Sequence, residues 1–236
     1  MADIEWTLPK PIDGGAWLAN PSESGGIATN GAEQTLISMA MYVKCRLIVA
    51  IRTTEEVLEA RAFFAEAAGK AGNILVPFFD GKRANWPVDQ WGRVAKPSLT
   101  RIPSLDGTEF ESDEIPVDSD IIASLVGDMD LRATSCSINV SQGEPIRAGQ
   151  WFSLGGRRAY LVRTAGAPSS GTQAITFYPP ARRAANNADP VELARPVCVM
   201  NQLGDDQGIQ ELTNLTQTIL TLDFREAIAA DSGSGT

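Results

Sequence analysis

The side chains with the greatest capacity for chemistry are nine carboxylates gathered between residues 106 and 130. They are Asp106, Glu109, Glu111, Asp113, Glu114, Asp118, Asp120, Asp128 and Asp130. Two such carboxylates could serve a glycoside hydrolase as acid and base, and a calcium loop also uses carboxylates. The order here lacks the alternating carboxylates and central glycine of a calcium loop, and sequence does not bring two acids across a sugar. We therefore interpret this segment as a solvated acidic connection.

Histidine is absent from the 236 residues. This excludes Ser-His-Asp and Cys-His catalysis, histidine-ligated zinc and an imidazole base. The three cysteines, Cys45, Cys136 and Cys198, lie far apart among apolar neighbours without a CxxC spacing. We expect buried free thiols, because neither a metal site nor a disulfide framework fits that spacing. The sequence thus predicts no catalytic, cofactor-binding or metal-binding residue, and a protein that is not an enzyme.

The tryptophans are the other side chains that could form a binding site. Trp86 and Trp91 lie in one predicted loop, and together with Trp151 they could line a carbohydrate cleft. A packed loop is the commoner reason for such aromatic residues. Trp6 and Trp17 lie in a polar, turn-rich stretch, where they either fill local apolar holes, which we favour, or dock on a neighbouring subunit.

Charge and hydropathy limit the partners. The chain carries 29 Asp and Glu against 20 Lys and Arg, a formal net charge of −9. An acidic chain does not follow a phosphate backbone by default, so we expect no specific nucleic-acid binding. No apolar run of about 18 residues is present, so we expect no insertion into a membrane.

The first half of the chain predicts one long strand and one helix. Residues 37–51 place apolar side chains on every second position, which is typical of a strand with one buried face. Thr53 and Glu56 fit a capping box at the start of a helix over residues 53–69. Its predicted core-facing stripe is Val57, Ala60, Phe64, Ala67 and Ala68. A buried strand should follow at residues 73–79.

The second half predicts short strands joined by tight turns. Gly155 and Gly156 separate two apolar runs, residues 150–154 and 159–163, which indicates a hairpin. Further strands are expected at residues 131–140, 174–178, 191–200 and 215–224. The fold class predicted is mainly β: a β-sandwich with one flanking α-helix, plus a second, small antiparallel β-barrel or sandwich.

The order of several short motifs resembles a known family. A capped helix runs into a buried strand over residues 53–79, and further motifs follow. They are DGTEFESD at 106–113, GQWFSL at 149–154, Arg158-Ala159-Tyr160, YPPAR at 178–182, PVCVM at 196–200 and LDFREA at 222–227. This order is similar to that of the distal tail proteins of siphophages, structural proteins of the phage tail tip. The resemblance covers most of the chain from about residue 40. Asp113 and Glu114 stand where the family pattern often has a second glycine, so that loop is expected to differ in shape.

The composition of the two ends of the chain, together with the resemblance, gives the domain organisation that we expect. Residues 1–35 would be an extended N-terminal arm, and residues 36–105 a belt-type β domain with a helix at 54–68. A strand at residues 212–226 would complete the belt. Residues 106–130 would connect it to a small antiparallel β domain at residues 131–211. Residues 231–236 would form a flexible tail.

The resemblance also implies function, partners and location. The expected function is a distal-tail-type ring, of six subunits, that joins the tail tube to the baseplate hub and fibres. Its partners would be itself, the tail tube protein, the tail hub and other tail-tip proteins. It would reside in the virion tail tip after assembly in the cytoplasm of the bacterial host. The alternative is a host-surface carbohydrate-binding module of the tail tip, with a host glycan as partner, and a glycosidase using acids of residues 106–130 ranks third.

Overall fold

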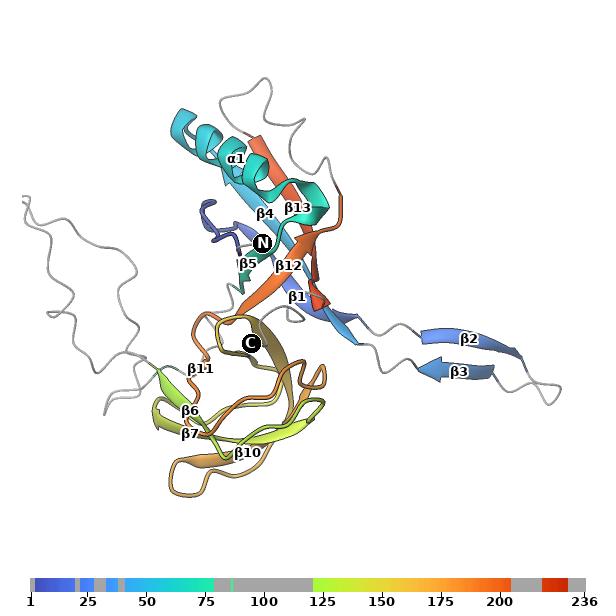
Figure 1. The fold of residues 1–236 in the computed structure, drawn as a ribbon, viewed down its shortest axis with the longest axis vertical. Helices are drawn as coiled ribbons and strands as arrows, with labels where there is room; N and C mark the ends of the chain where they lie inside the picture. Colours follow the sequence, from blue (N-terminus) through green and yellow to red (C-terminus); the bar gives the residue numbers. More distant parts are fainter. Residues whose placement is uncertain are drawn as a thin grey trace, which may run out of the picture.

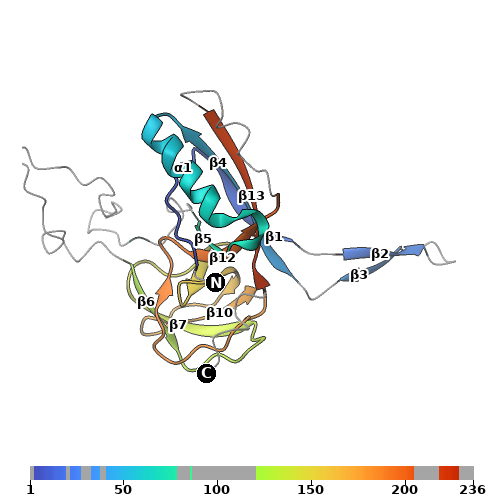
Figure 2. The ribbon, with the colours of Figure 1, turned by 45° about the horizontal axis from the view of Figure 1, so that its top comes forward.

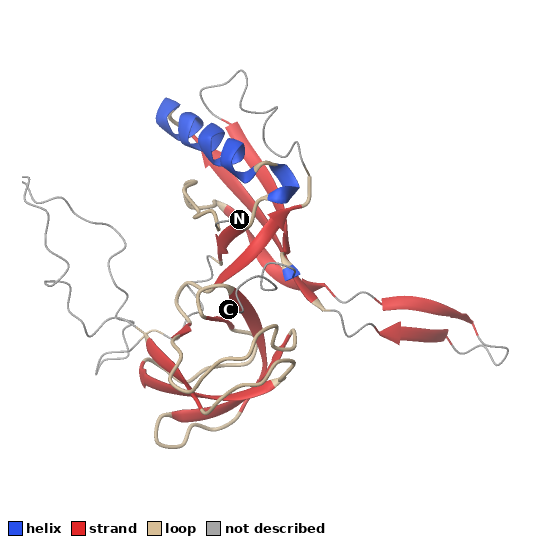
Figure 3. Ribbon diagram, in the orientation of Figure 1, coloured by secondary structure: helices blue, strands red, loops and turns tan. Residues whose placement is uncertain are grey.

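Two antiparallel sheets and one helix form the body of the protein. The computed structural model describes residues 3–19, 22–27, 33–37, 41–78, 86, 121–204 and 218–228. In these residues strands predominate, with one α-helix and the 3-10 turn η1 (Gly69–Ala71) that follows it (Figure 3). The predicted fold class, mainly β with a helix-flanked sheet and a second small β unit, is confirmed.

The first sheet has five strands drawn from both ends of the chain. In spatial order they are β1 (Asp13–Ala19), β4 (Tyr42–Ile51), β13 (Thr218–Glu226), β12 (Val197–Gln202) and β5 (Ile74–Pro77). All neighbours are antiparallel. The outer edge of β5 is covered by the N-terminal segment, because Ile4 bridges to Ile74 and accepts a hydrogen bond from Leu75 N.

The second sheet has six strands and curls nearly into a barrel. Its order is β11 (Val191–Glu192), β8 (Trp151–Leu154), β9 (Arg158–Ala165), β10 (Thr172–Tyr178), β7 (Ser135–Gln142) and β6 (Ile122–Val126). The two edge strands approach each other, since Ser124 of β6 bridges to Pro190 beside β11. The predicted hairpin around Gly155 and Gly156 is present, and both glycines have the positive φ that the turn requires.

A separate hairpin projects from the body. In the part of the chain that the structure describes, β2 (Ser22–Ile27) and β3 (Glu33–Ile37) pair with each other and with no other strand, so they form a two-stranded sheet. In both views this hairpin lies well beyond the end of β1 and β4, away from the two larger sheets (Figures 1 and 2). Residues 13–19, which fall within the arm expected at residues 1–35, form β1 and are an integral strand of the first sheet.

The helix α1 (Thr54–Ala67) covers one face of the first sheet (Figure 2). It begins with the predicted capping box: Thr53 Oγ1 accepts from Glu56 N, and Glu56 Oε2 accepts from Thr53 N, each at 3.2 Å. Its buried side chains are Val57, Ala60, Phe63, Phe64 and Ala67. They face the odd-numbered residues 43–51 of β4, which are all buried, as the alternation predicted.

Three details of the expected elements were wrong. The strand predicted at residues 37–51 is shorter in the first sheet, where β4 begins at Tyr42. Ile37 is the last residue of β3 in the hairpin. Ala68 is exposed and not part of the core stripe, because it is the left-handed residue that ends the helix. Phe63, which the stripe omitted, is buried against Phe64 and Trp6.

The predicted strand at residues 191–200 is in fact two strands in different sheets. β11 closes the second sheet, whereas β12 pairs with β5 and β13 in the first sheet. The range expected for the second domain, residues 131–211, therefore includes β12, which is a strand of the first sheet. The second unit is inserted into the first one, and its two ends meet where Phe78 N donates to Pro196 O at 2.7 Å.

Replacing Phe64 by alanine tests the packing of α1 on the sheet. Phe64 is 6% exposed, so Phe64→Ala should lower the free energy of unfolding by about 3–5 kcal/mol, the range for a buried aromatic side chain. Leu58→Ala on the same helix is the matched control, because Leu58 is 58% exposed. Urea denaturation measures both variants, and equal losses would show that Phe64 is not a core residue.

Candidate functional site

The predicted acidic segment lies largely outside the described residues. Seven of its nine carboxylates, Asp106 to Asp120, fall within residues 101–120, for which the structure gives no description. The other two, Asp128 and Asp130, are exposed near the end of β6. Asp128 Oδ1 accepts a hydrogen bond from Asn187 N at 2.8 Å, so this carboxylate fastens a turn.

Two of the three tryptophans suggested for a sugar-binding cleft are buried in the described part of the chain. Trp86 and Trp151 are each 8% exposed, and Trp91 lies outside the described residues. Trp151 stacks edge-on against Phe78, with ring centroids 5.0 Å apart. Trp6 fills a hole between Phe63 and Phe224, as we favoured. Trp17 is 44% exposed on β1, so of the tryptophans in the described residues it offers the most surface to a partner.

The three thiols are free, as expected. Cys45 and Cys198 are buried and Cys136 is half-buried. Burial raises the pKa of each thiol to about 12, and for Cys45 the nearby Asp223 carboxylate adds to the effect. Each thiol is therefore protonated at neutral pH and is a poor nucleophile.

In the described parts of the chain, no three side chains of the His, Cys, Asp or Glu type cluster closely enough to hold a metal ion. The helices found there include none that is long and apolar enough to cross a membrane.

The most unusual polar site joins the two sheets, and we call it the junction. It consists of Arg158 on β9, Arg182 after β10 and Glu226 at the end of β13. Arg158 and Glu226 have side chains only 3% and 1% exposed, and their charged atoms lie 3.5 Å apart. Arg182 Nε lies 3.6 Å from the same Glu226 oxygen. The second sheet thus supplies two cations to one buried anion of the first sheet.

Backbone groups complete the junction. Glu226 Oε2 accepts from Val43 N at 3.1 Å, and Arg158 Nη2 donates to Ala227 O at 3.1 Å and to Ile228 O. Arg182 Nη2 donates to Met41 O. Buried charges are tolerated only when they are paired and hydrogen-bonded. Arg158 and Glu226 meet that requirement, whereas the buried Nε of Arg182 is paired with Glu226 at 3.6 Å but makes no hydrogen bond. These contacts connect β4, β13 and the second sheet at one point.

Apolar contacts extend the junction along β8 and β12. All four residues of β8 are buried, because alternate side chains face different cores. Phe152 packs on Tyr160 and Phe177 inside the second sheet, whereas Trp151 belongs to the core of the first. Ser153 Oγ accepts from Val197 N at 3.1 Å. The two units therefore share a continuous buried contact.

The face of the first sheet opposite α1, which we call the outer face, carries charges and aromatic rings. Register places Lys44 of β4 directly opposite Arg225 of β13, and Arg46 opposite Asp223. Arg46 Nε pairs with Asp223 Oδ1 at 2.6 Å. The Arg225 guanidinium lies 4.4 Å from the Tyr42 ring centroid, and the Lys44 ammonium lies 5.7 Å from it. Trp17 is opposite Lys44 on the other side, on β1.

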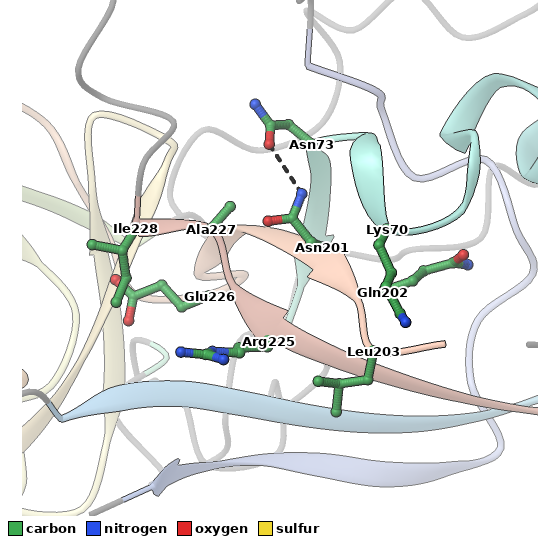
Figure 4. Close-up of a pocket in the computed structure, with 9 residues that line it drawn as sticks. All are labelled: Lys70, Asn73, Asn201, Gln202, Leu203, Arg225, Glu226, Ala227 and Ile228. Atoms are coloured by element: carbon green, nitrogen blue, oxygen red, sulfur yellow. Dashed lines mark hydrogen bonds between the residues drawn. The ribbon is translucent and has the colours of Figure 1, made fainter. Parts of the chain in front are cut away.

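An open pocket adjoins this face, where β12 extends beyond its pairing with β5 (Figure 4). Its volume is about 650 Å³, and nine residues line it: Lys70, Asn73, Asn201, Gln202, Leu203, Arg225, Glu226, Ala227 and Ile228. Asn201 Nδ2 donates to Gly72 O at 2.7 Å and to Asn73 Oδ1 at 3.1 Å. The side-chain nitrogen of Gln202 is buried and makes no hydrogen bond. Arg225 thus borders both the pocket and the outer face.

Comparison with known proteins adds no relative. No protein-family model matches the chain, and none of the curated proteins matches it. The fold, the surface chemistry and the resemblance in motif order are therefore the grounds for a proposed function.

Neither the junction nor the outer-face pair was predicted from the sequence. Glu226 and Arg158 are 68 residues apart, and Lys44 and Arg225 are still farther apart in the chain. One signal for Glu226 did exist in the sequence. It lies two residues after the strand pattern of residues 215–224, which places its carboxylate at the end of a sheet.

Removing the junction carboxylate should destabilise the protein strongly. Glu226→Ala leaves Arg158 buried without its counter-ion, so the free energy of unfolding should fall by about 3–5 kcal/mol. The matched control is Arg46→Ala, which breaks an exposed ion pair and should cost far less. Chemical denaturation compares the two. Similar losses would mean that Glu226 does not hold the sheets together.

The thiols should be unreactive in the folded protein. At pH 8, iodoacetamide should label Cys45 and Cys198 slowly and Cys136 somewhat faster, with complete labelling of all three after denaturation. Rapid labelling of either buried thiol in the native state would contradict its placement. Peptide mass spectrometry measures the rate at each site.

The same pKa values predict how stability depends on pH. An unfolded thiol ionises near 9.0, whereas the folded thiols stay protonated up to about 12. The unfolded state therefore binds fewer protons in this window, and the free energy of unfolding falls as pH rises through it. The stabilisation is complete below pH 9, and the slope is at most about 1.4 kcal/mol per pH unit for each thiol. Cys198→Ala should reduce the slope measured by denaturation between pH 9 and 10.

Proposed function

We propose that this protein is a structural component of a bacteriophage tail tip. It acts as a distal-tail-type ring, of six subunits by the family resemblance, between the tail tube and the baseplate hub and fibres. The chain works in the virion, where it binds copies of itself, the tube protein, the hub and other tail-tip proteins. It carries out no chemical reaction.

The observation that carries this proposal is the projecting β2–β3 hairpin. Among the described strands, its two strands pair only with each other, and they extend beyond the body of the subunit (Figure 1). An isolated two-stranded hairpin is at best marginally stable in water. A neighbouring subunit that covers the hairpin would supply the missing contacts. A contact of this head-to-tail kind closes into a ring when its rotation permits.

Two further features support a structural role. The two sheets are joined by a buried ion cluster and continuous apolar packing, so each subunit can transmit force as one body. The outer edge of β1 is unpaired among the described residues, and an unpaired edge invites pairing with another chain. Trp86 and Trp151 are buried, so these two of the three tryptophans behind the carbohydrate-binding alternative do not favour it.

Cryo-electron microscopy of the virion that carries this chain tests the proposal. The chain should form one ring, of six copies, between the last ring of the tube and the hub. Its presence along the whole tube, or its absence from the virion, would refute the proposal.

A variant tests the part played by the hairpin. Residues 21–38 are replaced by a short Gly/Ser linker, and the purified variant is first checked for an unchanged unfolding transition. We expect phage carrying the variant to lack complete tails. Normal tails with a well-folded variant would show that the hairpin is not the contact between subunits.

A further inference from the structure

Lys44 and Arg225 form a local electrostatic conflict on the outer face. They are directly opposite each other on adjacent antiparallel strands, where like charges destabilise a sheet. Within the described part of the chain, no carboxylate pairs with either side chain. The neighbouring Asp223 is instead engaged by Arg46 at 2.6 Å and 3.0 Å. Conflicts of this kind are expected where a surface has a function.

Tyr42 holds the two cations in place. The guanidinium of Arg225 and the ammonium of Lys44 both lie over its ring, which attracts cations through its negative face. This interaction offsets part of the repulsion but leaves both charges unneutralised. The arrangement is therefore ready for an anion, which would relieve the repulsion on binding.

The surroundings indicate a protein segment as the source of that anion. Among the described residues of this face, two cations are uncompensated, which is too few to follow a phosphate backbone, and the chain as a whole carries a net charge of −9. The same face exposes large apolar side chains, with Ile219 57% and Trp17 44% accessible. A ligand with carboxylates and apolar residues in alternation matches such a surface.

The chain itself contains such a segment. Residues 106–120 carry seven carboxylates and no lysine or arginine, interspersed with Phe110, Ile115 and Val117. We propose that the outer face around Lys44, Arg225 and Tyr42 is the docking site for residues 106–120 of a second copy of this chain. The proposal rests on the ring proposed above and names one of its contacts between subunits.

Carbodiimide cross-linking of the full-length chain tests this contact. The reagent joins a carboxylate to an amine only when the two are in contact, so Lys44 should couple to carboxylates of residues 106–120. A mixture of unlabelled and ¹⁵N-labelled protein at high concentration separates contacts between copies from contacts within one copy. We expect mixed-isotope cross-links at Lys44, a lower yield at high salt, and little cross-linking of the same segment to the exposed Lys10.

Variants sharpen the test. Arg225→Gln should lower the yield at Lys44 several-fold, while the charge-preserving Arg225→Lys should retain most of it. The matched control is Arg163→Gln, because Arg163 also lies over a tyrosine ring, at 5.4 Å from Tyr178, but on the second sheet. Arg163→Gln should leave the cross-linking yield at Lys44 unchanged. Circular dichroism confirms that each variant is folded.

Several outcomes would overturn the proposal. They are cross-links only within one copy, equal yields at Lys44 and Lys10, and an unchanged yield in Arg225→Gln. Binding of duplex DNA that is lost in a Lys44→Gln, Arg225→Gln double variant would assign the face to nucleic acid instead. If the virion shows a ring but these cross-links are absent, the contact proposed here is rejected and the proposed ring stands. If the cross-links form but the virion shows no ring, the proposed ring is rejected and the contact between copies stands.

Discussion

A single buried carboxylate, Glu226, determines how the two halves of this molecule are connected. Its side chain is almost fully buried, yet it is surrounded by two guanidinium groups and a backbone N–H. A charge in such a place is costly unless every partner is present. The second sheet must therefore dock in one orientation, because only that orientation brings Arg158 and Arg182 to Glu226. Apolar packing between β8 and the first sheet adds attraction but is far less directional.

This fixed geometry bears on the proposed role in a ring. Domains joined by a small polar interface move relative to each other by default. Here the shared buried contact and the paired charges oppose such motion, so the second sheet keeps a defined direction relative to the first sheet. A closed ring requires identical contacts at every position, and a subunit with a constant shape meets that requirement.

The sequence predicted the elements better than their arrangement. The alternation in β4, the Thr53 and Glu56 capping box and the Gly155–Gly156 turn are local signals, and each one specifies its own structure. The sheet to which β12 belongs is not a local property. Cys198, Val199 and Met200 are all buried, since β12 has the core of the first sheet on one face and the second sheet on the other. An apolar run of this kind predicts burial but does not name its partners. The charge pairs of the junction and the outer face depend on strand register across many residues, so no local pattern reveals them.

The insertion of the second sheet between β5 and β12 has a consequence for evolution and engineering. Because Phe78 and Pro196 are hydrogen-bonded neighbours, the inserted unit begins and ends at one point of the first sheet. Such an inserted unit can be replaced by another domain without changing the path of the chain through the first sheet. The exchange has one chemical condition. Any replacement domain must place a cation next to Glu226, or Glu226 in the first sheet must be replaced by an uncharged residue at the same time.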